Sequence, residues 1–472
     1  MSFTTKTLKP TKYQPIKVQI VSRYIPVENT VGNATYILDF MRYLRQVGCE
    51  IECTVLNSSP NGKTPWYIIP SSLAAVAKVS AKNNLRIGSV LLRFNSLSDW
   101  LIAPLRLAYM KLPESWRNIY RSARDKQQKT HGHIVTLQDW DTLATAEEVA
   151  FASSRFVKFK PDVVVTNYAW LSNVLEVIPP NESVLGAILT HDILHKRVAD
   201  FRKIGADPEL SDWNWDKEAA QLRKAQVLLA IQEEEAETLK KMAPSSEVIC
   251  MPMSVVCHSL DTKQVHGRCL FVGSASSHNS YSLRWFLENV WPLVLKADPY
   301  STLHVCGDVC KQIEESFPNV RLLGRVANLE PEYGAAEVCL VPLLAGSGLK
   351  IKLVEAMSHS RACVSTSVGI QGLPDIVGSA VLVADTAEDF AAAIHTLLTN
   401  PQKRQCMEDQ ARKYVTEKLS PKAVYQPFVE RIEQHLQQVA NRSTKQSLEK
   451  KLSGGKVLTS NLTPNKEKLH EI

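Results

Sequence analysis

The sequence contains little that would place the chain outside a reducing, aqueous compartment. Its ten cysteines are scattered over 472 residues without one Cys-x-x-Cys pair, so neither a disulfide framework nor a zinc ligand set is expected. No run approaches the roughly 18 consecutive apolar residues of a membrane-spanning helix. The opening MSFTTKTLKPTKYQ is polar and basic and has no apolar core behind it, which argues against a signal peptide. We therefore expect a cytoplasmic protein.

Concentrated positive charge is also scarce. The net charge of +7 is spread along the chain, with denser basic runs only at 117–129 and after 441. Because aromatic residues do not alternate with the lysines and arginines, we expect no nucleic-acid partner. The region 60–140 contains amphipathic segments flanked by arginines. It suits an ordinary helical insertion, which we favour, or a peripheral contact with the cytoplasmic face of a membrane.

Apolar strands alternate with amphipathic helices along most of the chain. The first unit is KVQIVSRYIP, then a loop with Gly32 and Asn33, then the helical pattern ATYILDFMRYLRQVG and the strand IECTVL. A second series with the same order starts at HGRCLFVGS. Val/Ile/Leu-rich strands separated by helices predict an α/β fold with two Rossmann-like, doubly wound parallel-sheet domains.

The composition divides the chain into five predicted segments. They are an N-terminal extension (1–14), a first Rossmann-like domain (15–262) with an insertion at about 60–140, a second Rossmann-like domain (263–420), a C-terminal helix that packs back on the first domain (421–440), and a disordered polar tail (441–472).

One stretch in the second domain carries phosphate-binding features. PLLAGSGLKIKLVEAMSHS, residues 342–360, places a glycine turn between a buried strand and a helix that contains two lysines and Glu355. The free N–H groups of a helix N-terminus attract anions, and lysines would add positive charge. A nucleoside diphosphate fits this pattern. A glycine loop followed by a surface ion pair fits the spacing equally well.

This stretch resembles glycosyltransferase family 4 (group 1), the retaining sugar-nucleotide transferases of the GT-B fold, in the members that carry Gly-Ser-Gly-x-Lys-x-Lys-x-x-Glu. The resemblance covers roughly residues 15–440, is strongest from LFVGSASSHN to GIQGL, and is weak between 60 and 140. It implies a donor domain at 263–420 and an acceptor domain at 15–262, facing each other across a cleft.

The resemblance also implies roles for single residues. Gly273 and Ser274 match the loop beside the donor diphosphate, Val326 matches a backbone contact to the base, and Glu355 matches the carboxylate that holds the ribose. The implied donor site consists of Gly273, Ser274, Val326, Gly346, Ser347, Gly348, Lys350, Lys352 and Glu355.

Two departures from the family pattern affect this donor site. The first glutamate of the Glu-x7-Glu motif falls on Ser347. The arginine and lysine that usually follow the first loop are missing, because GSASSHNSYSLRWF offers only Arg284 inside a helix. We therefore expect the diphosphate charge to rest on Lys350, Lys352 and the helix terminus.

In the first half, Gly32 and Asn33 match the family's glycine loop on the acceptor side, and His191 matches a histidine that faces the donor sugar. A structural histidine bonded to the backbone is the alternative. The residues expected to act in catalysis are His191, Lys352 and Glu355.

No metal site is predicted. HDILH, with His191 and His195, lacks a metalloprotease glutamate, and in QDWDT we expect Asp141 to be a helix N-cap.

The resemblance implies a retaining glycosyltransferase of the hexosyltransferase type that uses a nucleotide-diphosphate sugar and no cofactor. Its acceptor would be a glycan or a lipid-linked molecule of polysaccharide or glycoconjugate biosynthesis. The alternative is a non-catalytic GT-B scaffold or a sugar-nucleotide-binding protein, which the serine at position 347 keeps open.

Overall fold

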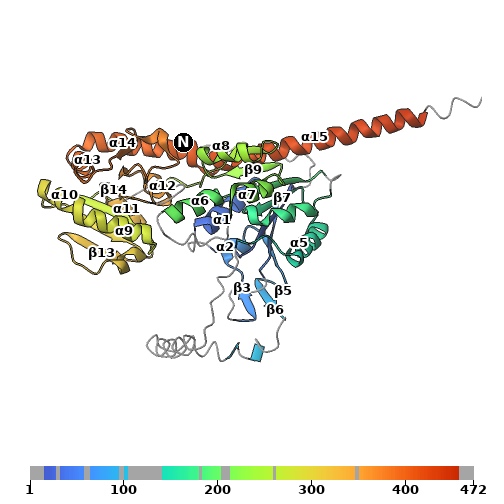
Figure 1. Ribbon diagram of the computed structural model, residues 1–472, viewed down its shortest axis with the longest axis horizontal. Helices are drawn as coiled ribbons and strands as arrows, with labels where there is room; N and C mark the ends of the chain where they lie inside the picture. Colours follow the sequence, from blue (N-terminus) through green and yellow to red (C-terminus); the bar gives the residue numbers. More distant parts are fainter. Residues whose placement is uncertain are drawn as a thin grey trace, which may run out of the picture.

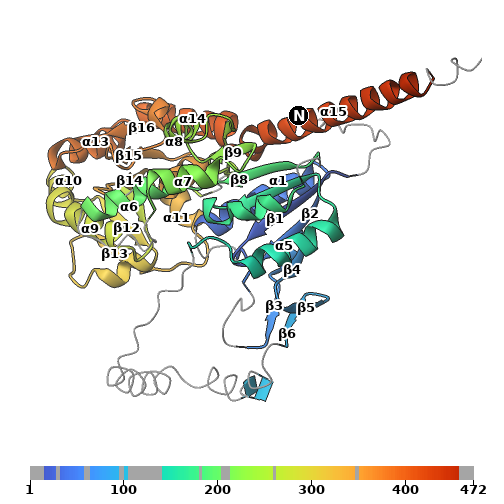
Figure 2. The ribbon, with the colours of Figure 1, turned by 45° about the vertical axis from the view of Figure 1, so that its right-hand side comes forward.

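The computed structural model describes residues 15–27, 32–57, 64–94, 100–101, 103–104, 141–179, 183–203, 213–258, 262–345 and 350–455. Two α/β domains lie side by side, each with a parallel sheet and helices packed on it (Figures 1 and 2). The central strands are Val/Ile/Leu runs that are buried on both faces. The predicted α/β class with two Rossmann-like sheets is confirmed.

The first sheet has the strand order β10–β9–β8–β7–β1–β2–β4. Its order reverses between β1 and β7, which pair in parallel, so the connections leave this pair in opposite directions and open a crevice at the carboxyl ends. The elements are β1 (Lys17–Ser22), α1 (Gly32–Gln46), β2 (Glu50–Val55), β4 (Lys78–Ala81), α5 (Ala146–Phe159), β7 (Val163–Asn167), β8 (Leu185–Leu189), α6 (Leu194–Lys203), α7 (Trp215–Leu222), β9 (Val227–Ala230), α8 (Glu233–Met242) and β10 (Glu247–Cys250).

The second sheet has the order β13–β12–β11–β14–β15–β16 and reverses between β11 and β14. A second crevice therefore opens after these two strands. The elements are β11 (Arg268–Val272), α9 (Ser277–Trp285), α10 (Trp291–Ala297), β12 (Thr302–Cys306), β13 (Val320–Gly324), α11 (Glu330–Ala335), β14 (Val338–Val341), α12 (Ile351–Ser358), β15 (Ala362–Ser365), β16 (Val381–Val383), α13 (Ala387–Thr399) and α14 (Pro401–Tyr414).

The region 60–140 differs from the helical insertion that the sequence favoured. After β3 (Trp66–Ile68) and the single turn α2 (Ser71–Ala74), β4 joins the edge of the first sheet, and β5 (Asn84–Ile87) and β6 (Val90–Arg93) form a separate antiparallel sheet with β3. This small sheet projects from the first domain (Figures 1 and 2). The alternation of apolar and polar residues is too brief in such short strands to predict them from the sequence. Residues 105–140 lie outside the described part.

The last helix, α15 (Pro421–Gly455), returns from the second domain to the first (Figure 1). Tyr425 and Phe428 are fully buried in the same core as Phe40 of α1, with ring centroids 5.5 and 5.8 Å from that of Phe40. The helix continues through 441–455, so the predicted disordered tail is wrong there. Extending an existing helix needs no new nucleus, and these residues include good helix formers. Residues 456–472 lie outside the described part.

Within the described residues, no helix is long and apolar enough to cross a membrane.

The packing of α15 gives a stability prediction. Phe428→Ala leaves a cavity between α15 and α1, and we expect a loss of about 3–5 kcal/mol in the free energy of unfolding. Gln437→Ala, at an exposed position of the same helix, should change it by less than about 0.5 kcal/mol. Chemical denaturation followed by fluorescence measures both, and equal effects of the two variants would contradict this packing.

Candidate functional site

Two lysines meet at the start of α12, on the carboxyl side of the second sheet. Lys350 directly precedes the helix, whereas the sequence analysis placed it inside the helix. Its Nζ donates to Gln371 Oε1 at 3.2 Å. Lys352 Nζ donates to Asn279 Oδ1 at 2.5 Å and lies 4.7 Å from the centroid of the Phe271 ring. Gly346, Ser347 and Gly348 lie outside the described residues.

Both ammonium groups are held in surroundings that oppose their charge. Burial lowers the pKa of Lys350 to about 8. Burial, followed by the charge of Lys350, lowers the pKa of Lys352 to about 7. Each lysine donates to the oxygen of a neutral amide. A bound anion would raise both pKa values again, so these surroundings would suit a negatively charged group.

The loop after β11 lies against these lysines. Gly307, which has a φ of 102°, lies in the loop after β12. A Cβ there would lie 2.1 Å from the carbonyl oxygen of Gly273 in the loop after β11, so only glycine lets these two loops approach this closely. Asn279 Nδ2 donates to the carbonyl oxygen of Ser274 at 3.1 Å while its Oδ1 accepts from Lys352. Asn279 thus ties this loop to α12.

Sequence reasoning missed Asn279 and its neighbour His278. The Nε2 of His278 lies 3.2 Å from Ser276 Oγ, and partial burial together with the charges of Lys352 and Lys350 lowers the pKa of His278. These residues occupy the place where the family pattern has basic side chains. The signal was the polar run SSHN at the start of the helix after β11.

Glu355 lies one turn into α12. Its carboxyl lies beside the Tyr333 hydroxyl, whereas Lys352 binds Asn279. Burial raises the pKa of its carboxyl, and the neighbouring Tyr333 hydroxyl and His258 partly oppose the rise. The Tyr333 hydroxyl is buried and has no partner of hydrogen-bond geometry among the described residues. Val326, in the loop after β13, packs on the hydrophobic cluster that contains Tyr333. The predicted base and ribose residues therefore lie in one region.

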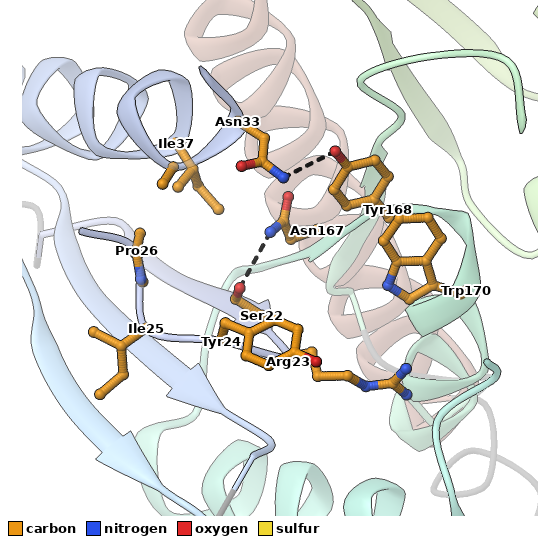
Figure 3. Close-up of a pocket in the computed structure, with 11 residues that line it drawn as sticks. Ser22, Arg23, Tyr24, Ile25, Pro26, Asn33, Ile37, Asn167, Tyr168 and Trp170 are labelled. Carbon is orange, nitrogen blue, oxygen red and sulfur yellow. Dashed lines mark hydrogen bonds between the residues drawn. The ribbon is translucent and has the colours of Figure 1, made fainter. Parts of the chain in front are cut away.

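The first domain has a pocket of about 250 Å³ at its own crevice (Figure 3). Asn33 Nδ2 donates to Tyr168 Oη at 2.9 Å, and Asn167 Nδ2 donates to Ser22 Oγ at 3.1 Å. The rings of Tyr168 and Trp170 stack with centroids 3.8 Å apart. The pocket therefore combines amide and hydroxyl groups with aromatic rings.

The structure corrects the expected loop at Gly32 and Asn33. Both are the first residues of α1 rather than part of the preceding loop. The periodic apolar residues that indicated this helix begin only at Ile37, so its first turn carried no such signal. The helix start nevertheless brings Asn33 into the lining of the pocket.

His191 connects this pocket with the second domain. It is buried, and its Nε2 lies 2.6 Å from Asn167 Oδ1. Because the Asn167 amide nitrogen donates to Ser22, we assign the proton to His191 Nε2, which leaves Nδ1 as an acceptor. Burial lowers the His191 pKa to about 3, so the imidazole is neutral at physiological pH.

A second cavity, of about 150 Å³, joins the two domains. It is lined by Asn33, Tyr168 and His191 from the first domain and by Ile351, the first residue of α12, from the second. Tyr168 and His191 have φ values of 80° and 61°, which are uncommon for residues other than glycine and cost about 1–3 kcal/mol each. Two of the six described residues other than glycine with positive φ therefore line this cavity.

Buried carboxyls after β8 and β9 were also missed by sequence reasoning. Burial raises the pKa of Asp192 to about 6 and that of Glu235 to about 8. Glu218 accepts hydrogen bonds from the backbone N–H of Leu194 and from His195 Nδ1, at 2.9 and 2.7 Å. Their positions follow from packing of three helices, which no local motif reports.

His195 is bound to Glu218 while His191 faces Asn167, so the two histidines do not share a partner. Among the described residues, no group of three or more His, Cys, Asp or Glu side chains is placed to hold a metal ion. Asp141 is not a helix cap: Thr145 caps α5 in a capping box with Glu148, and Asp141 accepts from the Trp213 indole at 3.0 Å. Asp139 lies outside the described residues.

Residues 266–400 match the family model described as "Glycosyl transferases group 1". This span contains the loop after β11 and all of α12. A protein of Klebsiella pneumoniae, "Uncharacterized 44.6 kDa protein in cps region", is 27% identical over 168 residues. That match covers 33% of this chain and 43% of the relative. The chain therefore spans less than half the length of that relative. The second domain is thus similar to a group 1 glycosyltransferase domain.

Solved structures share the whole two-domain arrangement. Sucrose-phosphate synthase from Thermosynechococcus elongatus has a TM-score of 0.56 at 14% identity, covering 89% of this chain and 98% of that one. HepE from Anabaena, in complex with UDP and glucose, has a TM-score of 0.54 at 13% identity, covering 89% and 99%. These likenesses show that the chain has the GT-B fold, as the sequence predicted.

The contact between Lys352 and Asn279 gives a pH-dependent prediction. A hydrogen bond to an ammonium group is stronger than one to a neutral amine, and Lys352 is charged mainly below pH 7. We expect Asn279→Ala to lower the free energy of unfolding by about 2 kcal/mol at pH 6 and by clearly less at pH 9.

Denaturant titrations at the two pH values measure this difference. The matched control is Asn289→Ala, which removes an exposed asparagine bonded to the Trp285 carbonyl; its effect should be small and independent of pH. An equal loss for Asn279→Ala at both pH values would show that the charge of Lys352 is not involved.

Proposed function

We propose that this protein is a retaining glycosyltransferase that moves a sugar from a nucleoside-diphosphate sugar to a glycan acceptor. One observation carries the proposal: the cavity lined by His191 reaches Ile351 at the start of α12, the residue between the two buried lysines in the chain. The match of residues 266–400 to group 1 glycosyltransferases supports it. Retention at the anomeric carbon and the hexosyltransferase type rest on the resemblance to family 4.

On the donor side, Lys350, Lys352 and the N-terminus of α12 hold the diphosphate. Bound phosphate oxygens favour the charged form of both lysines, so the electrostatic interaction strengthens as negative charge develops on the leaving group. Glu355, with the Tyr333 hydroxyl beside its carboxyl, receives the ribose hydroxyls. Gly273 and Ser274 border the diphosphate, and Val326 lies at the base. This arrangement supplies positive charge without a metal ion.

On the acceptor side, the pocket at β1 and β7 holds a sugar ring. Aromatic rings pack against the apolar faces of pyranoses, and the polar groups of Asn33 and Asn167 can bond to hydroxyls. Gly32 sets the start of α1 and so the position of Asn33. A lipid-linked glycan fits as well as a free one, because only the terminal sugar has to enter the pocket.

In the reaction, the bond between the anomeric carbon and the diphosphate oxygen breaks, and a bond from the acceptor oxygen to the same carbon forms. The acceptor proton leaves with the diphosphate. His191 remains neutral and orients a sugar hydroxyl through Nδ1, since its low pKa excludes a role as a cation.

The proposal is tested first by donor binding. The purified chain is heated with UDP, GDP, ADP or CMP and their sugars, and a ligand that binds the native state raises the melting temperature. UDP is the first probe because HepE, which shares the fold, was crystallised with it. We expect one nucleotide to bind selectively. Lys352→Met and Glu355→Gln should each weaken it at least about tenfold, or ~1.4 kcal/mol.

Lys296→Met, at an exposed position on α10, is the control for loss of a lysine and should bind as the wild type does. Absence of a shift with every nucleotide would contradict the donor site. A selective shift without any transfer or hydrolysis of the nucleotide sugar would favour the non-catalytic alternative.

The acceptor pocket is tested separately with Asn33→Ala. This change removes the hydrogen bond to Tyr168, and we expect kcat/KM for the acceptor to fall at least about tenfold while the nucleotide shift stays unchanged. Release of nucleoside diphosphate is measured over a panel of free and lipid-linked glycans. Gln46→Ala, exposed at the other end of α1, is the control. Equal loss of donor binding in Asn33→Ala would refute the separation of the two sites.

A further inference from the structure

The small sheet β3–β6–β5 has one face made only of apolar side chains. Trp66 pairs with Leu92 and Leu92 with Leu85, while Ile68 pairs with Val90 and Val90 with Ile87. Directly paired residues of antiparallel strands point to the same side, and alternate residues along a strand do too. We call this surface the insertion face. It consists of Trp66, Ile68, Leu85, Ile87, Val90 and Leu92.

The insertion face points away from the protein. On the opposite side of the sheet, Leu91 is fully buried in the core of the first domain and Tyr67 packs against that core. The side chains of Ile68, Leu85 and Ile87 are 68%, 55% and 59% exposed. The sheet extends beyond both domains in two views (Figures 1 and 2). A projecting apolar surface of this kind indicates a binding partner.

Aromatic residues continue the insertion face beyond β6. Phe94, next in the alternation, is 61% exposed, and its ring stacks on that of Trp100 with centroids 5.7 Å apart. The Trp66 ring lies 5.9 Å from the same tryptophan. Leu101 is 78% exposed. Half-buried tryptophan rings beside exposed phenylalanine and aliphatic side chains are typical of surfaces that enter the interfacial layer of a membrane.

Basic side chains outnumber acidic ones around this face. Residues 64–104 contain Lys78, Lys82, Arg86 and Arg93 against one acidic residue, Asp99, and Lys82 forms an ion pair with Glu147. The sequence that follows, 105–130, has seven lysines and arginines against two acidic residues. Such a basic region is attracted to acidic phospholipid headgroups. The same charges on a second copy of the chain would repel each other.

Size also distinguishes a membrane from a second copy. Three strands of three or four residues make a face of roughly 15 by 15 Å, or about 200 Å². A stable protein–protein interface needs about 800 Å² from each partner. A lipid surface has no such minimum, because apolar side chains and basic charges add their effects along it.

We propose that the insertion face docks on the surface of an anionic lipid membrane. β4, which connects this sheet to the first domain, belongs to the same sheet as β1 and β7. Docking would therefore hold the first domain and its pocket at the membrane surface. The proposal is independent of the glycosyltransferase activity.

Flotation of the full chain with vesicles tests it. Vesicles of phosphatidylglycerol and phosphatidylcholine should bind the protein at low salt, and vesicles of phosphatidylcholine alone should bind it much less. The triple variant Ile68→Ser, Ile87→Ser and Phe94→Ser should lose binding at least about tenfold. The matched control carries Val157→Ser, Tyr281→Ser and Tyr300→Ser, which are 65%, 67% and 85% exposed elsewhere, and should bind as the wild type does.

All six positions are exposed, so we expect each variant to fold. Thermal unfolding checks this. Failure of the wild type to bind anionic vesicles would overturn the proposal, as would equal binding by the triple variant. Light scattering measures the oligomeric state of both proteins. If the wild type is a dimer and the triple variant is a monomer, the insertion face binds a second copy of the chain, and the membrane proposal is overturned.

Discussion

The reversal of strand order in each sheet is the constraint on which the sites depend. Parallel strands need crossover connections, and where the order reverses the connections leave on opposite faces. The crevice in the first sheet lies between β1 and β7, and Asn167 at its rim binds both Ser22 and His191. The crevice in the second sheet lies between β11 and β14, where Asn279 and Lys352 join. One asparagine thus connects the two sides of each crevice.

The electrostatics of the two crevices differ for the same physical reason. Removal of water disfavours charge, so it lowers the pKa of Lys350 and Lys352 on one side and raises that of Asp192 and Glu235 on the other. The second domain therefore keeps lysines that a diphosphate would stabilise. The first domain keeps neutral groups, including His191, that suit hydroxyls.

The C-terminal helix links these domains mechanically. α15 leaves the second domain after α14 and supplies Tyr425 and Phe428 to the core of the first, where Tyr425 also bonds to Ser254 of the interdomain segment. Any movement of one domain relative to the other must bend the chain at Met251–His258 and before Pro421, the two crossings between the domains. Opening of the shared cavity would occur by such a hinge, with both cores left intact.

Much of the fold was predictable because strand and helix periods are local. Val/Ile/Leu runs and amphipathic stretches indicated both doubly wound domains. A glycine loop after a buried strand indicated Lys350, Lys352 and Glu355 as candidate residues, whereas Gly273 was implied only by the family resemblance. Where the local signal was short or absent the predictions failed. β3, β5 and β6 are too brief for alternation to show, and Asn33 belongs to a helix turn that precedes the periodic apolar residues.

The sequence by itself determined the two α/β domains, the lysine pair and the glutamate of α12, because each depends on neighbours along the chain. Only the tertiary structure decided that Asn279 binds Lys352 across 73 residues, that His191 is neutral, and that one face of the small sheet is wholly apolar. These properties arise from burial and from pairing between distant strands. Neither is a function of local sequence.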